Sequence, residues 1–207
     1  VIGTEAGRER GQSGGEAGEG LDAYLGTPHA PPPLNDLRWR PPQPPRPWDA
    51  PRDCTDFAPA CVQPPALLGN APEKQDEDCL YLNVWRRKGI EKAPVMVWIH
   101  GGGFATGAGS MAWYDGTALA RRDAVVVTIN YRLGPFGFFA HPALSAENEE
   151  ALSGNYGLLD QIAALQWVRA NIAAFGGDPQ NVTVFGESAG AVGIAHLMVS
   201  PLARGLF

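Results

Sequence analysis

A serine flanked by two glycines is the first sign of chemistry in this sequence. The segment Gly186-Glu187-Ser188-Ala189-Gly190 follows a β-branched run, 182–184, and precedes residues 191–199, which are compatible with a helix. A serine at a sharp turn from strand to helix has an exposed hydroxyl, and glycines two residues to either side let neighbouring backbones approach without a Cβ clash. The flanking patterns therefore favour a nucleophilic Ser188 over an ordinary serine in a tight turn.

Three consecutive glycines are the second sign. The apolar run 93–99 predicts a strand buried on both faces of a parallel sheet, and it leads into His100-Gly101-Gly102-Gly103. Backbone N–H groups of such a loop can lie close to a ligand. Together with the N–H of Ala189, those of Gly102 and Gly103 would form an oxyanion hole. The serine motif downstream favours this interpretation over a flexible glycine turn.

Strand and helix patterns alternate along the rest of the chain. Such elements are needed to position Ser188 and the glycine loop. The expected elements are strands at 79–85, 93–99 and 123–130, a short helix at 117–122, a helix at 158–172 that Gly176-Gly177 ends, and the strand and helix on either side of Ser188. This alternation predicts an α/β fold, in which a mostly parallel central sheet carries helices on both faces.

The first fifty residues have a different composition. Residues 3–20 are rich in glycine and glutamate, which by composition alone is typical of a disordered segment. From Pro28 to Pro51 the chain is rich in proline, which excludes regular helix and favours an extended strap over the surface.

Longer motifs resemble those of the type-B carboxylesterases and lipases, the family that includes the cholinesterases. The similar segments, in chain order, are 26–30, 36–39, 77–85, 130–134, 154–161, 175–179 and 186–190. The resemblance covers nearly all of the chain. It implies the α/β-hydrolase fold, with an N-terminal hairpin and a proline-rich strap within residues 1–50. His29 and Asn35 depart from the family pattern, which usually has tyrosine and glycine there.

The same resemblance implies an activity and a disulfide. The expected reaction is hydrolysis of a small-molecule carboxylic ester through a serine acyl-enzyme, with no cofactor and no metal. The family's disulfide corresponds to Cys61 and Cys79. Cys54 has no evident partner, so it is either a free thiol or a competitor for Cys61. A bridge indicates an oxidising compartment, but a reduced pair in a cytoplasmic enzyme remains an alternative, and the localisation stays open.

A complete catalytic triad is not apparent. An α/β-hydrolase supplies its serine first, then an acid, then a histidine, yet no acidic residue occurs in the 19 residues after Ser188. His196 would lie about 12 Å along the elbow helix from the serine, so it is expected to be a packing residue. His100 is expected to be structural, and His29 and His141 lie in loops. We therefore expect residues 1–207 to be the N-terminal part of one α/β-hydrolase domain, truncated after the elbow helix and inactive alone.

Composition excludes several other classes of function. The net charge of −6 and the lack of a basic cluster argue against nucleic acid as a partner. No apolar run approaches the roughly 20 residues that span a bilayer. No metal-binding cluster or dinucleotide motif is apparent. One alternative to an active esterase is a catalytically inert fragment. Another is a cholinesterase-like binding or adhesion domain that lacks the nucleophile, and the presence of Ser188 argues against it. Substrate preference and oligomeric state are not indicated.

Overall fold

The computed structural model describes residues 1–14, 19–65, 72–147 and 151–207. Its strands are β1 (Ile2–Gly3), β2 (Arg8–Ser13), β3 (Leu21–Pro28), β4 (Arg52–Cys54), β5 (Ala60–Cys61), β6 (Gln75–Asp76), β7 (Tyr81–Arg87), β8 (Ala93–Ile99), β9 (Val125–Ile129) and β10 (Gly177–Gly186). Its α-helices are α1 (Thr117–Ala120), α2 (Gly134–Phe138), α3 (Pro142–Ser145), α4 (Tyr156–Asn171) and α5 (Ala189–Val199). Short 3₁₀ turns are η2 (Asn35–Leu37), η3 (Ala112–Tyr114), η4 (Ile172–Phe175) and η5 (Pro201–Ala203).

The main sheet has eight strands and mixed directions. Its order is β1-β2-β3-β7-β9-β8-β10, with β4 beside β2. The three strands β9, β8 and β10 are parallel, whereas β7 is antiparallel to both β3 and β9. The parallel part is therefore the part that leads into the glycine loop and the serine. The predicted strands and helices at 93–99, 117–122, 123–130 and 158–172 are present with shifts of a few residues at their ends.

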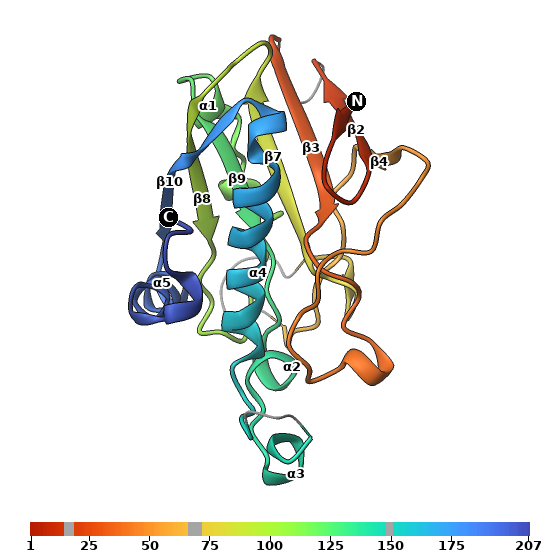
Figure 1. Ribbon diagram of the computed structural model, residues 1–207, viewed down its shortest axis with the longest axis vertical. Helices are drawn as coiled ribbons and strands as arrows, with labels where there is room; N and C mark the ends of the chain where they lie inside the picture. The colour runs from red at the N-terminus through yellow and green to blue at the C-terminus, as the bar shows by residue number, and fades with distance from the viewer. Residues whose placement is uncertain (15–18, 66–71, 148–150) are drawn as a thin grey trace.

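Helices lie on both faces of this sheet, α4 and α5 on one side and the short α1 on the other. Figure 1 shows α4 lying along one face, with α5 beside it at the end of β8 and β10. The larger apolar core lies between these helices and the sheet, and it contains Val95, Val97 and Ile99 from β8. A smaller core on the opposite face joins Ala120 of α1 to Val126 of β9.

The strand β8 differs from its prediction in one respect. Its residues alternate between fully buried ones on the α4 side and partly exposed ones, such as Met96 and Trp98, on the other. The expectation of burial on both faces is wrong for β8, because α1 has only four residues and covers little of that face. The neighbouring β9 is buried throughout.

The N-terminal segment is a set of strands rather than a disordered tail. β1 pairs antiparallel with β2, and β2 pairs antiparallel with β3. Residues 15–18 of the glycine-rich stretch lie outside the described residues. The proline-rich strap is extended from residue 41 to 48, and Trp48 anchors it, because its backbone N–H donates to Ala6 O at 2.8 Å and its Nε1–H to Arg8 O at 3.0 Å.

Candidate active site

Ser188 lies at the turn between β10 and α5. Its backbone has φ +52° and ψ −121°, a conformation that non-glycine residues rarely adopt. Such a conformation costs about 1–3 kcal/mol and persists only where the surrounding structure enforces it. The residue is exposed, and α5 starts immediately after it. The strand, the turn and the helix expected around this serine are all present.

The two glycines of the motif explain how the turn is held. A Cβ on Gly190 would overlap the carbonyl oxygen of Ile99 at the end of β8, and a Cβ on Gly186 would lie 2.7 Å from the same oxygen. Contacts that close to a backbone atom cannot be relieved by rotating a side chain. Both glycines are therefore required for α5 to start directly against β8, with Ser188 at the apex.

The loop after β8 lies against this turn. A Cβ on Gly101 would be 3.1 Å from the Cβ of Ser188, so the first glycine of the triplet is in contact with the elbow. Gly102 and Gly103 have φ values of +108° and +63°. The Gly102 carbonyl accepts hydrogen bonds from the N–H groups of Ala105 and Thr106, at 3.0 Å each. These bonds close the loop into a turn over Gly102–Thr106.

The backbone N–H groups of this loop are available to a ligand. Within the described ranges, the N–H groups of Gly102 and Gly103 have no protein acceptor. The N–H of Ala189 belongs to the first turn of α5, where helix N–H groups have no partner within the helix. Because α5 begins directly after Ser188, the positive end of its helix dipole lies beside this serine.

His100 supports the loop from beneath. The ring is buried, and its Nδ1–H donates to the Gly101 carbonyl at 2.8 Å. It also stacks on Tyr131, whose hydroxyl donates to the His100 carbonyl at 2.8 Å. Burial lowers the pKa of His100 to about 4, so the ring is neutral at physiological pH. This geometry agrees with the structural role expected for His100.

The other three histidines are engaged elsewhere. His29 is buried and donates from Nε2 to the Asn130 carbonyl at 3.2 Å, while His141 caps α3 by accepting from the Ala143 N–H. His196 lies on α5 and donates from Nδ1 to the Val192 carbonyl at 2.8 Å. It is exposed, so the expectation that it packs is wrong. Among the described residues, no histidine makes a hydrogen bond to Ser188.

Comparison with known proteins identifies the family. The model of the carboxylesterase family matches residues 1–207. The chain belongs to the carboxylesterase family. It is 54% identical over 201 residues to fumonisin B1 esterase of Sphingopyxis macrogoltabida, and the match covers 95% of this chain and 37% of the relative. It is 50% identical over 212 residues to para-nitrobenzyl esterase of Bacillus subtilis, covering 100% of this chain and 42% of that protein.

Solved structures of carboxylesterases have the same fold. One structure of para-nitrobenzyl esterase superposes with a TM-score of 0.91 at 48% identity, and it covers all of this chain and 42% of its own length. A carboxylesterase of Geobacillus stearothermophilus gives a TM-score of 0.89 at 48% identity with the same coverage. The α/β-hydrolase fold is therefore established, and this carboxylesterase-family chain spans about two fifths of the length of its relatives.

The cysteines of this carboxylesterase-family chain are paired as the resemblance implied. Cys61 and Cys79 form a disulfide with a Cα–Cα distance of 4.9 Å, inside the usual range. Cys54 is a free and fully buried thiol. Burial raises the pKa of Cys54 to about 12, so this thiol is not poised for reaction.

Sequence reasoning missed a buried ion pair between the segment after β9 and α4. Arg132, after β9, donates three hydrogen bonds to Asp160 of α4: Nη2 to Oδ1 at 2.7 Å, Nε to Oδ2 at 2.8 Å and the backbone N–H to Oδ2 at 3.0 Å. Both side chains are almost fully buried. Two charged residues within otherwise apolar segments were the available signal, but pairing them required the tertiary structure. The pair fixes α4 to the segment that follows β9.

None of the helices in the described residues combines the length and the apolar character that a membrane span requires. In those same residues, no group of three or more histidine, cysteine or acidic side chains is arranged to hold a metal ion.

Proposed function

We propose that the protein hydrolyses small-molecule carboxylic esters through a serine acyl-enzyme intermediate. The observation that carries this proposal is the conformation of Ser188, an exposed serine held at φ +52° where β10 turns into α5. Membership of the carboxylesterase family supports it. So do the names of the similar proteins, which include a fumonisin B1 esterase and a para-nitrobenzyl esterase.

The reaction assigns one role to each group. Ser188 Oγ bonds to the ester carbonyl carbon, and its proton passes to a base. The N–H groups of Gly102, Gly103 and Ala189 donate to the oxyanion of the tetrahedral intermediate, and the start of α5 adds its dipole. Collapse of the intermediate breaks the bond to the alcohol, which leaves with the proton. Water then attacks the acyl-enzyme, and the carboxylic acid and the free serine are released.

We propose that the base and its acidic partner come from outside residues 1–207, which form the N-terminal part of one α/β-hydrolase domain. The four histidines support this, because each of them is engaged away from Ser188. The isolated chain is then expected to lack turnover. Turnover by the isolated chain at ordinary rates of about 1–10³ s⁻¹, abolished by Ser188→Ala, would contradict this proposal.

The nucleophile can be tested by labelling and by substitution in the intact protein. A fluorophosphonate probe should label Ser188, and Ser188→Ala should lower kcat for p-nitrophenyl acetate by at least about 10³-fold. The matched control is Ser110→Ala, which removes a hydroxyl outside the elbow and should leave both readouts unchanged. Circular dichroism checks that each variant folds. Labelling at Ser110 or Ser153, or full activity of Ser188→Ala, would falsify the assignment.

A further inference from the structure

The glycine loop, which starts after β8, returns to its own beginning at Gly107. This residue has φ +108°, and a Cβ on it would overlap the ring of His100 and lie 2.6 Å from the Gly101 carbonyl oxygen. Immediately before it, the backbone N–H and the hydroxyl of Thr106 both donate to the Gly102 carbonyl, at 3.0 Å and 3.2 Å. The backbone at Gly107 therefore packs against the start of the loop, so a displacement of Gly107 also displaces Gly101 and Gly102.

One side chain binds both backbone polar groups of Gly107. The Oε1 of Gln63 accepts from the Gly107 N–H at 2.8 Å, and the Nε2 of Gln63 donates to the Gly107 carbonyl at 2.9 Å. The partners fix the orientation of the amide, because the N–H can only donate and the carbonyl can only accept. Two bonds from one planar amide also fix the direction of the Gly107 backbone, which a single bond would leave free to rotate.

Gln63 is itself held by the segment that carries the disulfide. Its Nε2 also donates to the Cys61 carbonyl at 2.9 Å, and its backbone N–H donates to Gln75 Oε1 at 3.1 Å. Cys61 is buried in β5 and is joined covalently to Cys79, two residues before β7. Because these contacts already order the amide, its bonds to Gly107 form with a smaller loss of conformational entropy.

The chain beyond Gly107 is held separately, by β9 and the residue that follows it. The Gly109 N–H donates to Asn130 Oδ1 at 2.9 Å, and the Thr128 hydroxyl donates to the Gly109 carbonyl at 2.8 Å. These contacts do not involve Gln63. Removing the Gln63 amide should therefore leave Gly109 in place and release only the end of the glycine loop at Gly107.

We propose that Gln63 is a positioning residue for the oxyanion loop, an inference that rests on the proposed ester hydrolysis. By fixing Gly107 against Gly101, the Gln63 amide sets the position of the Gly102 and Gly103 N–H groups, which donate to the oxyanion in that reaction. A misplacement of about 1 Å can cost about 10²-fold in rate. Gln63 acts through Gly107 and on the transition state, so its removal lowers kcat and leaves KM almost unchanged.

The test uses the intact protein with Gln63→Met, which keeps the length of the side chain and removes both polar atoms. With p-nitrophenyl acetate, kcat per active site should fall about 10- to 10²-fold, while KM changes by less than about 2-fold. End-point labelling with a fluorophosphonate counts the active sites, so a loss of folded protein does not lower this value. The inhibition constant of a trifluoromethyl ketone, which forms a tetrahedral oxyanion adduct with the serine, should rise by the factor by which kcat/KM falls.

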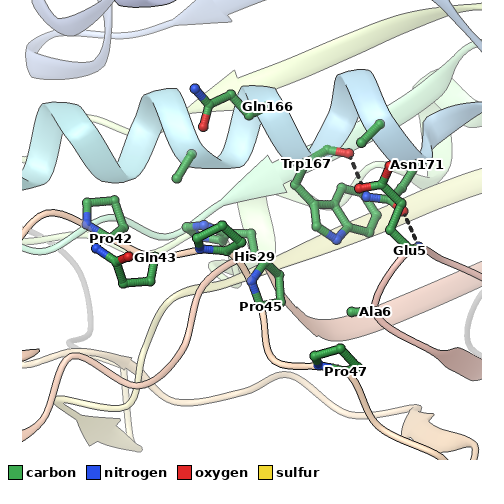
Figure 2. Close-up of a pocket in the computed structure, with 13 residues that line it drawn as sticks. Glu5, Ala6, His29, Pro42, Gln43, Pro45, Pro47, Gln166, Trp167 and Asn171 are labelled. Carbon is green, nitrogen blue, oxygen red and sulfur yellow. Dashed lines mark hydrogen bonds between the residues drawn. The ribbon is translucent and has the colours of Figure 1, made fainter.

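The matched control is Gln43→Met, which makes the same chemical change in the strap. Gln43 is exposed, and its Nε2 donates to the Pro41 carbonyl at 3.2 Å. Figure 2 shows Gln43 at a cavity of about 380 Å³ between the strap and α4, whose described lining residues include none from the glycine loop. Both kcat and the inhibition constant should stay unchanged in this variant.

Ser188→Ala, measured alongside, separates this inference from the proposed function. If Ser188→Ala abolishes turnover but Gln63→Met keeps the natural kcat per active site, the positioning role is overturned and the ester hydrolysis stands. If Ser188→Ala keeps turnover, both are overturned. A fall in kcat for Gln63→Met without a rise in the inhibition constant would also overturn the positioning role.

A second variant decides the matter if Gln63→Met fails to fold. Gln63→Glu keeps an acceptor for the Gly107 N–H and loses the donor to the Gly107 carbonyl. Its kcat per active site should also fall, and an unchanged value would overturn the positioning role.

Discussion

At the elbow the decisive contacts are between backbones, whereas in the N-terminal region, residues 1–54, they are between buried side chains. Gly186 and Gly190 let α5 lie close to the carbonyl of Ile99, with Ser188 at the apex of the turn. In the N-terminal region, by contrast, Glu9 and Cys54 are fully buried side chains brought together by pairing of β2 with β4. A site that depends on close backbone contacts can be recognised from a short glycine motif in the sequence. A site that depends on side chains from distant segments has no such motif.

The buried carboxyl of Glu9 is an example of a group whose surroundings come from distant segments. Its Oε2 accepts from the Thr27 hydroxyl at 2.8 Å, and the residue has no exposed surface. Desolvation by burial raises the pKa of Glu9 to about 7, against the lowering effects of the Thr27 bond and of the Arg52 charge. The protonation state of this group therefore changes near neutral pH.

The largest effect is expected from Gly190→Ala, which breaks the backbone packing of the elbow. The added Cβ would overlap the Ile99 carbonyl, so the variant should lose at least about 3 kcal/mol of stability and should not react with fluorophosphonate. The matched control is Gly103→Ala. It adds a Cβ at φ +63° where no atom lies within 4 Å, and should cost only about 1–2 kcal/mol. Equal melting temperatures for the two variants would contradict this account of the elbow.

The next effect concerns catalysis rather than folding. Gly102→Val and Gly103→Val should each lower kcat by about 10²–10³-fold, because a β-branched side chain at positive φ moves an oxyanion donor out of place. Steady-state kinetics on p-nitrophenyl acetate measures this, with Gly89→Val as the control. Gly89 is also left-handed, at φ +72°, but precedes β8 at the other end of the strand. Normal turnover in both loop variants would show that the triple glycine is only a turn.

A smaller effect is expected from the disulfide. Replacing Cys61 and Cys79 together by serine should cost about 3 kcal/mol, the chain-entropy value for a loop of this length. Peptide mapping of oxidised protein should find these two residues joined, and Cys54 should be alkylated only after unfolding, since it is buried. A Cys54–Cys61 bridge in the map would show that the pairing is wrong.

The smallest expected effect is a pH dependence of stability that arises from Glu9 in the N-terminal region and not from the elbow. Because the folded-state pKa of Glu9 is raised, its contribution to stability is complete below about pH 4.5 and is lost as the pH rises through 7. Relative to Glu9→Gln, the natural protein should therefore lose up to about 3 kcal/mol between these limits. Urea unfolding at several pH values measures the difference.

The control is Asp53→Asn, which removes a carboxylate from the exposed ion pair with Arg10 and should change stability by less than about 1 kcal/mol. A pH-independent difference for Glu9→Gln would exclude a buried, titrating Glu9.

Much of the core could be predicted because local patterns determine it. The apolar runs at 93–99 and 123–130 indicated β8 and β9, and the helical spacing from Leu158 to Ile172 indicated α4. The faces of β8 were predicted less well, because burial of Met96 and Trp98 depends on how much of that face a helix covers. The strands of the glycine-rich N-terminus were found only through the family resemblance, since composition alone indicated disorder.

The elbow and the glycine loop could be recognised from the residues alone, because each is a short segment in which glycines permit a close backbone path. Which polar groups become buried together depends on the packing of the whole fold. Arg132 meets Asp160 across 28 positions, and Glu9 meets Cys54 through strand pairing. His29 and Trp167 come from distant parts of the chain and line one cavity. The physical reason is that desolvation and partner choice depend on what packs nearby in space, and residue spacing along the chain carries no information about that.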